Sequence, residues 1–203
     1  MICKTWKTSF NRVIVMVSIC AQYYLSPSAY SMTFSLIKNS GDSHKTALFA
    51  QGPIEDGDAD KFRAIVSNAS RDEFGSVILF LNSPGGSVNA SFELVQAMDL
   101  TSVTTMVGGG SICASACASI LFVSGQHRKV LEGGHLGFHS CYTKQGNNIV
   151  NPQDDVCNER IGENAVRHGV DYGDIVMWAN GYGPQNMAWL DKEMACFELA
   201  ICH

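Results

Sequence analysis

The sequence lacks an apolar stretch long enough to cross a bilayer. A membrane-spanning helix needs about 20 consecutive apolar residues, and the apolar run Val13–Ala21 is far shorter. Internal repeats and low-complexity tracts are missing as well. What is present is typical of a soluble globular protein, because 46% of the 203 residues are hydrophobic and the mean hydropathy is close to zero. A chain of this length fits one domain with a sizeable core.

The first 31 residues differ from the rest in composition. They hold three basic residues and no acidic one, then the short apolar run, then small residues around Ala29-Tyr30-Ser31. This order is that of a secretory signal peptide cleaved near residue 31. We therefore expect residues 1–31 to be a signal peptide and residues 32–203 to form a soluble, exported domain. An uncleaved N-terminal anchor is the alternative.

An excess of basic residues is also missing. The chain has 14 Lys and Arg against 19 Asp and Glu, for a formal net charge of −5 at pH 7. Loss of the three basic residues in the signal segment changes this charge to −8. An acidic surface disfavours nucleic acid and anionic membranes as partners, so we expect neither.

Six cysteines follow the signal segment, and an even number in an exported protein favours disulfides. They are Cys113, Cys117, Cys141, Cys157, Cys196 and Cys202. Six cysteines allow 15 connectivities, and the sequence does not choose among them. The pairs Cys141–Cys157 and Cys196–Cys202 would close short loops and are our predictions. Cys113 and Cys117 lie four residues apart on an expected helix, where a bridge is strained and buried free thiols are an equal alternative.

Apolar runs and helical periodicities alternate along the chain, which predicts an α/β fold with parallel strands. Residues 32–44 and 147–151 are polar and predict loops. The expected strands are residues 46–51, 76–81, 103–107, 128–131 and 136–139. The expected helices are residues 58–70, 88–100, 114–123, 154–168 (capped by Asp154 or Asp155), 172–179 and 191–199.

Three pieces of the sequence have the chemistry of a serine hydrolase. Ser115 opens the expected helix after a glycine-rich strand end, where unpaired backbone N–H groups and the positive end of the helix dipole lie. His139 ends an expected strand and is 24 residues away; a histidine can remove the serine proton. Asn82-Ser83-Pro84-Gly85-Gly86 follows a buried strand, so its N–H groups open at the carboxyl end of the sheet and can stabilise an oxyanion.

These pieces resemble the Clp-type serine peptidases. The resemblance rests on Phe80-Leu81-Asn82-Ser83-Pro84-Gly85-Gly86-Ser87, on Ala114-Ser115-Ala116, on Gly125, Arg128 and His139, and on the opening segment Ala47–Asp56. It covers about half of the chain, from residue 45 to residue 140. Each piece alone is common, but the order and spacing of four pieces are fairly specific.

The resemblance implies a ClpP/crotonase-like fold of repeated strand–strand–helix units over residues 32–203. It implies Ser115 as the nucleophile, His139 as the base, and the backbone N–H groups of Gly86 and Ala116 as the oxyanion hole. It also implies that Gly85 and Ser87 lie against the substrate. The family's ring-forming habit favours a homo-oligomer.

The third member of the catalytic triad is open. The family has an aspartate well after the histidine, and Asp191 is the nearest match. Asn186, Asp171 and Asp174 are the other options, and a chain without any orienting carboxylate is a further one. A second departure is Ala116, where the family usually has methionine.

A zinc site is a competing interpretation. His135, His139 and Cys141 share strand parity and point to one face, and three such ligands can hold zinc with an open position. This interpretation leaves Ser115 and the Pro84-Gly85-Gly86 turn without a role. We therefore expect no metal and no cofactor.

The expected function is that of an exported, periplasmic or secreted, ATP-independent peptidase of short or unfolded peptides. The resemblance is closer to exported stand-alone bacterial relatives of the family than to its ATP-dependent members. An exported protein has no ATP around it, so we expect no ATP-driven unfoldase as a partner. One alternative is a non-catalytic binding or assembly protein with an incomplete triad. Another is acyl-thioester chemistry, which would need a coenzyme A supply outside the cell.

Overall fold

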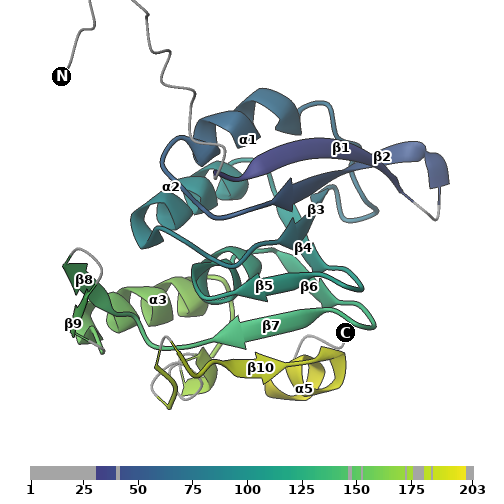
Figure 1. Ribbon diagram of the computed structural model, residues 1–203. Helices are drawn as coiled ribbons and strands as arrows, with labels where there is room; N and C mark the ends of the chain where they lie inside the picture. The colour runs from purple at the N-terminus through teal and green to yellow at the C-terminus, as the bar shows by residue number, and fades with distance from the viewer. Residues whose placement is uncertain are drawn as a thin grey trace, which may run out of the picture.

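A five-stranded sheet forms the centre of the computed structural model, which describes residues 31–39, 42–145, 148–151, 153–171, 173–175, 181–183 and 185–199. The strand order is β1-β2-β3-β4-β6 (Figure 1). These strands are β1 (Thr33–Asn39), β2 (Asp42–Gln51), β3 (Val77–Asn82), β4 (Val103–Val107) and β6 (His127–Val130). The pairs β2–β3, β3–β4 and β4–β6 are parallel, whereas β1 pairs antiparallel with β2.

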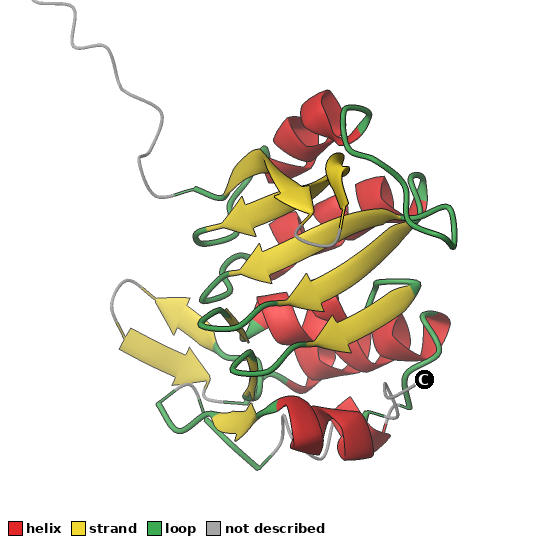
Figure 2. Ribbon diagram, turned by 90° about the vertical axis from the view of Figure 1, so that its right-hand side faces the viewer, coloured by secondary structure: helices red, strands yellow, loops and turns green. Residues whose placement is uncertain are grey.

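Helices cover one face of this sheet. Figure 2 shows the main sheet in front and the long helices behind it. These helices are α1 (Asp58–Val66), α2 (Val88–Asp99), the π-helix η1 (Cys117–Phe122) and α3 (Asp155–Arg167). The helix α5 (Lys192–Glu198) lies instead beside β10, in the foreground at the bottom of Figure 2. All six residues of η1 are buried, so this helix lies inside the core. Among the described residues, no helix combines the length and the apolarity that a bilayer crossing requires.

A second, smaller sheet lies beside the carboxyl ends of the main strands. It has the order β10-β7-β5, with β5 (Ile112–Ala114), β7 (His135–Phe138) and β10 (Ala188–Leu190). Strand β5 runs parallel to β7, with Ala114 opposite Gly137. Ser83, just past β3, exchanges backbone hydrogen bonds with Ile112 and Ala114 of β5. The small sheet is therefore joined directly to the turn that follows β3.

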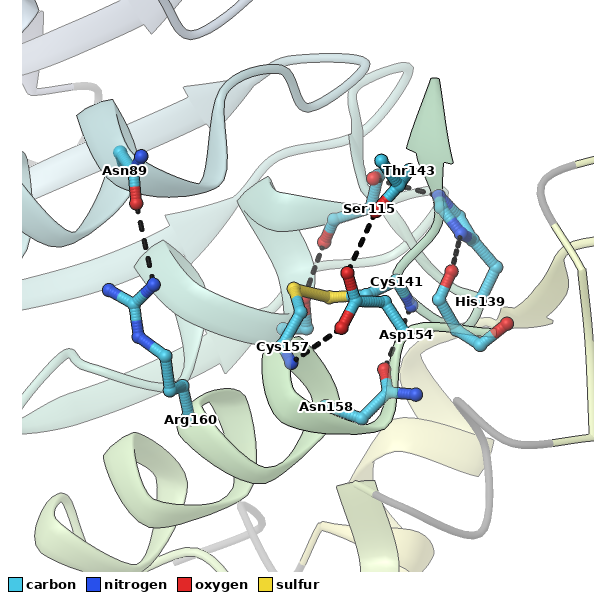
Figure 3. Close-up of a disulfide and its surroundings, with 11 residues drawn as sticks. Asn89, Ser115, His139, Cys141, Thr143, Asp154, Cys157, Asn158 and Arg160 are labelled. Carbon is cyan, nitrogen blue, oxygen red and sulfur yellow. Dashed lines mark hydrogen bonds between the residues drawn. A yellow bond between two sulfur atoms is a disulfide. The ribbon is translucent and has the colours of Figure 1, made fainter. Parts of the chain in front are cut away.

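The hairpin of β8 (Thr143–Gln145) and β9 (Asn148–Asn151) projects from the body next to α3 (Figure 1). A disulfide between Cys141 and Cys157 joins the base of the hairpin to the first turn of α3 (Figure 3). The side chain of Asp154 caps that helix by accepting a hydrogen bond from Cys157 N. The disulfide thus holds the loop after β7 against the first turn of α3.

Most of the expected α/β pattern is confirmed. The buried run before Asn82 is β3, with parallel neighbours on both sides. The predicted helices at 88–100 and 154–168 are α2 and α3, and the N-cap of α3 is Asp154, the first of the two residues proposed. The strands expected at 128–131 and 136–139 are β6 and β7, each shifted by one residue.

Three local predictions were wrong. Residues 32–44 were expected to be a loop but contribute β1, which pairs antiparallel with β2. The alternation of Met32, Phe34 and Leu36 with polar residues was a strand signal that the prediction overlooked. The loop expected at 147–151 is part of the β8–β9 hairpin. The helix expected at 114–123 begins only at η1, because residues 112–114 form β5 and the chain turns sharply at Ser115.

The same sharp turn corrects the prediction for Cys113 and Cys117, which form a disulfide. Cys113 lies on β5 and not on a helix, so the bridge does not have to fit helical spacing. The predicted pair Cys141–Cys157 is confirmed. Cys202, residues 1–30 of the signal peptide expected at 1–31, and most of the helix expected at 172–179 lie outside the described residues.

Candidate active site

Ser115 occupies a strained elbow between β5 and η1. Its φ of 57° lies in the left-handed region, which costs a residue with a side chain about 1–3 kcal/mol and persists only where surrounding contacts enforce it. Here Ser115 N donates to Gly137 O at 2.8 Å. Its carbonyl accepts from both the backbone N–H and the hydroxyl of Ser119, each at 2.9 Å. These bonds turn the Ser115 side chain outward at the end of the small sheet.

His139 follows β7 directly and faces this serine. Its Nε2 lies 2.8 Å from Ser115 Oγ, and its Nδ1 lies 2.7 Å from the carbonyl oxygen of Ser140 (Figure 3). A carbonyl can only accept, so Nδ1 carries the hydrogen and donates it. In a neutral ring Nε2 is then unprotonated and accepts from the Ser115 hydroxyl. This tautomer is the one that a general base for Ser115 needs.

The imidazole of His139 is shielded from water. Only 9% of the residue is exposed, and its ring packs at 5.6 Å between centroids against Tyr142. Burial disfavours the charged form and lowers the pKa of His139 below its ordinary value; the hydrogen bond to Ser140 opposes this only in part. The ring is therefore neutral at pH 7 and ready to accept a proton.

The turn after β3 presents a backbone N–H to the same place. Ile54 N donates to Gly85 O at 2.9 Å, and Ser87 N donates to Ile54 O at 2.8 Å. Gly86, between these two bonds, has its own N–H on the side away from Ile54. Ala116 is the N-cap of η1, where backbone N–H groups have no partner within the helix. Both N–H groups are at residues that line one pocket with Ser115.

Both glycines of this turn are required by close approach. A side chain on Gly86 would overlap the backbone of Ile54. A Cβ on Gly85 would lie 2.6 Å from both Ala114 O and Ser115 Cβ. The turn thus packs directly on the elbow, and only glycine allows that contact.

The pocket around Ser115 has a volume of about 250 Å³. It is lined by Gly86, Val88, Ser115, Ala116, Ser119, His139, Cys141, Tyr142, Cys157 and Ile161. One end is polar, where Ser115, His139 and the two N–H groups meet. Much of the remaining lining is apolar, from Val88, Ile161 and the Cys141–Cys157 disulfide. This arrangement suits a carbonyl group at the polar end with an apolar substituent beyond it.

None of the four candidates for the third triad member is a hydrogen-bond partner of His139 in the described part of the chain. The ring contacts Ser115, Ser140 and Tyr142 in the described part of the chain. The Asp191 carboxylate is exposed and caps α5 by accepting from Met194 N at 2.9 Å. The other three options also have local roles. Asp171 accepts from Gly173 N, Asp174 lies near Asp171 with a pKa raised mainly by burial, and Asn186 N donates to Gly183 O.

Two further sequence expectations change in the structure. The hydroxyl of Ser87, expected against the substrate, accepts from Ala90 N at 3.2 Å and caps α2. Cys141, one ligand of the competing zinc interpretation, is bonded to Cys157 and is not available to a metal.

Sequence reasoning missed three contributors to the site. Ser119 holds the elbow, Tyr142 packs on the imidazole, and the Ser140 carbonyl fixes the tautomer. The position of Ser119, four residues after Ser115, was a usable signal, because such a hydroxyl can bond the carbonyl one turn back. A main-chain carbonyl leaves no signal in the sequence.

The contact between the turn and the elbow predicts that Gly85→Ala is destabilising. Overlap with the Ala114 carbonyl oxygen and Ser115 Cβ, together with a φ of 94° at Gly85, should cost about 1–3 kcal/mol. Gly108→Ala is the matched control, because its Cβ would meet only Phe80 at 3.7 Å. Urea unfolding of both variants measures the difference, and equal midpoints would contradict the described packing.

Comparison with known proteins agrees with this geometry. The Clp protease family model matches residues 40–148, more than half of the chain. Among solved structures, a mutant of the 1510-N membrane-bound stomatin-specific protease has the same fold, with a TM-score of 0.60 and 16% identity over 76% of this chain and 75% of that one. No curated protein matches. The chain belongs to the Clp protease family.

Proposed function

We propose that the chain is an exported, ATP-independent peptidase that uses Ser115 as its nucleophile and His139 as its general base. The 2.8 Å contact between Ser115 Oγ and His139 Nε2, in the tautomer set by Ser140, is the observation that supports this best. Such a distance is within reach for proton transfer. A neutral, buried imidazole supplies the acceptor.

The reaction follows from this arrangement. Ser115 Oγ attacks the substrate carbonyl while its proton passes to His139 Nε2. The developing oxyanion accepts from the N–H groups of Gly86 and Ala116, which are fixed before the substrate arrives. His139 then gives the proton to the leaving amine, and water hydrolyses the acyl-enzyme by the same route in reverse.

The orienting group in this proposal is the main-chain carbonyl of Ser140. The N–H of Cys141 is in the same planar peptide unit as this carbonyl and donates to Asn158 Oδ1 at 2.8 Å, so the carbonyl is held in place. It can fix the tautomer and orientation of His139 as a carboxylate does. As a neutral acceptor, it stabilises the imidazolium less than a carboxylate would. We therefore expect a slower enzyme than one with a full triad.

The pocket suggests the class of substrate. Its volume of about 250 Å³ and its wall of Val88, Ile161 and the Cys141–Cys157 disulfide suit one apolar side chain of an extended peptide. Short or unfolded peptides fit such a shallow, open site. A homo-oligomer stays a prediction.

Export is supported by the two disulfides of the described chain, because such bonds persist in oxidising compartments. The composition of residues 1–31 fits this interpretation. Outside the cytoplasm there is no ATP to drive an unfoldase.

A second candidate function is a non-catalytic binding protein with the same fold. The observation that favours it is the absence of a carboxylate beside His139 among the described residues. The two candidates differ in the reactivity of Ser115, which the first experiment measures.

A fluorophosphonate probe should label the wild-type protein at Ser115. Ser115→Ala should abolish labelling, because the nucleophile is gone, and His139→Ala should slow it by about 10²–10⁴-fold. Ser119→Ala removes the other serine hydroxyl of the pocket and should still be labelled at Ser115, although more slowly, because Ser119 holds the elbow. Mass spectrometry of the labelled peptide identifies the site. A folded wild-type protein that never reacts would favour the binding protein instead.

Asp191→Ala should leave the labelling rate within about threefold of wild type, because the Ser140 carbonyl orients the imidazole. The variant should be less stable by about 1 kcal/mol, since α5 loses its N-cap. Glu193→Ala, in the exposed first turn of the same helix, is the control for stability. A labelling rate about 100-fold lower would instead restore Asp191 as the third member of the triad.

The labelling rate should fall on acidification with a midpoint below 6.5. Only neutral His139 accepts the proton of Ser115, and burial lowers its pKa, so the active form persists to lower pH than for an exposed histidine. The rate is full above that pKa and is lost as the pH falls through it. A rate profile between about pH 4 and 8, with circular dichroism to verify folding, measures the midpoint; a value at or above 6.5 contradicts a buried base.

A further inference from the structure

A disulfide encloses the Ser115 elbow. The segment Cys113-Ala114-Ser115-Ala116-Cys117 places one cysteine two residues before the serine and one two residues after it. The two sulfurs are bonded to each other, and neither cysteine is exposed. The bond therefore closes a ring of five residues with Ser115 at its midpoint.

The two ends of this ring belong to different elements. Cys113 lies on β5 and pairs in register with Leu136 of β7. Cys117 is the first residue of the π-helix η1. The bridge keeps their Cα atoms 5.1 Å apart, so the chain must turn tightly between the strand and the helix. Ser115 is the residue that does so, with its left-handed φ of 57°.

The ring also ties the elbow to the strand that presents the base. Strand β7 pairs with β5 through Cys113 and Ala114, and His139 follows β7 directly. The 2.8 Å separation of Ser115 Oγ and His139 Nε2 thus depends on two connections. The β5–β7 register sets the position of His139, and the turn at Ser115 sets the position of Oγ.

We propose that the Cys113–Cys117 disulfide is a positioning element for Ser115, so that full activity requires the oxidised protein. This inference rests on the function proposed above. Without the bridge, only the bonds to Gly137 and Ser119 oppose relaxation of Ser115 toward an ordinary right-handed conformation, which would turn Oγ away from His139. The enzyme then lacks full activity until it reaches an oxidising compartment. The reduced protein is therefore less active before export.

The redox step is an ordinary thiol–disulfide exchange. A dithiol such as dithiothreitol supplies two electrons and two protons, the S–S bond breaks, and Cys113 and Cys117 become thiols while the reductant becomes a cyclic disulfide. Since both sulfurs are buried, the elbow must open before a reductant can attack. The oxidised form should therefore persist once the protein has folded.

The test compares wild type with Cys113→Ala/Cys117→Ala by two assays, fluorophosphonate labelling and hydrolysis of a p-nitrophenyl ester. A misplaced nucleophile should lower kcat by about 10- to 100-fold, because a displacement of about 1 Å has an effect of that size. KM should stay within about twofold, because the pocket wall does not change. Val66→Ala on α1 is the control for lost stability, since it removes buried volume far from the elbow and should keep kcat per folded molecule.

A second measurement, on the wild-type protein, tests the proposal even if the double variant does not fold. Wild type is treated with dithiothreitol, and peptide mapping follows each disulfide separately. Labelling should fall in proportion to the reduced fraction of Cys113–Cys117 and return on reoxidation. Because Cys141–Cys157 lines the pocket, the loss is assigned to Cys113–Cys117 only in samples where Cys141–Cys157 stays oxidised.

The outcomes separate the two proposals. If wild type and the folded double variant are labelled at equal rates, the positioning role is wrong and the peptidase proposal stands. If the double variant does not fold, wild-type labelling that persists after reduction of Cys113–Cys117 also shows that the positioning role is wrong. If oxidised wild type is never labelled, the proposed function fails and this inference fails with it.

Discussion

The candidate active site depends on one hydrogen bond between groups that are distant in sequence, from the hydroxyl of Ser115 to Nε2 of His139. Neither residue has a special chemistry alone. The serine needs an elbow that exposes its oxygen, and the histidine needs a strand that ends opposite it. Strands β5 and β7 meet both needs because they are parallel neighbours whose ends lie at the same edge of the small sheet.

Burial and the backbone together set the state of His139. The imidazole is nearly closed off from water, which lowers its pKa and keeps it neutral. The Ser140 carbonyl places the remaining hydrogen on Nδ1. The family ordinarily uses an aspartate for this purpose, whereas the histidine of this chain bonds to a main-chain carbonyl. A neutral carbonyl stabilises the protonated imidazole less than a carboxylate does, so this geometry favours a weaker general base.

Two disulfides fix the backbone around the candidate active site. Cys113–Cys117 spans the elbow, and Cys141–Cys157 holds the loop after β7 against α3. Both bonds contribute to the surroundings of one pocket. The glycines at 85 and 86 have the opposite role, because they remove side chains so that the turn can pack on Ser115 and on Ile54.

The local patterns of the sequence determined much of this protein. The apolar run before Asn82 predicted β3, the spacing of Ser115 and His139 predicted their pairing, and Asp154 was foreseen as a helix cap. These features depend on near neighbours or on a motif, so they are visible in one dimension. Tertiary structure alone decided the rest: the pairing of β1 with β2, the strand that puts Cys113 within bonding distance of Cys117, and the carbonyl beside His139. Each of these depends on a partner brought close by folding, and a backbone carbonyl is the same for every residue type.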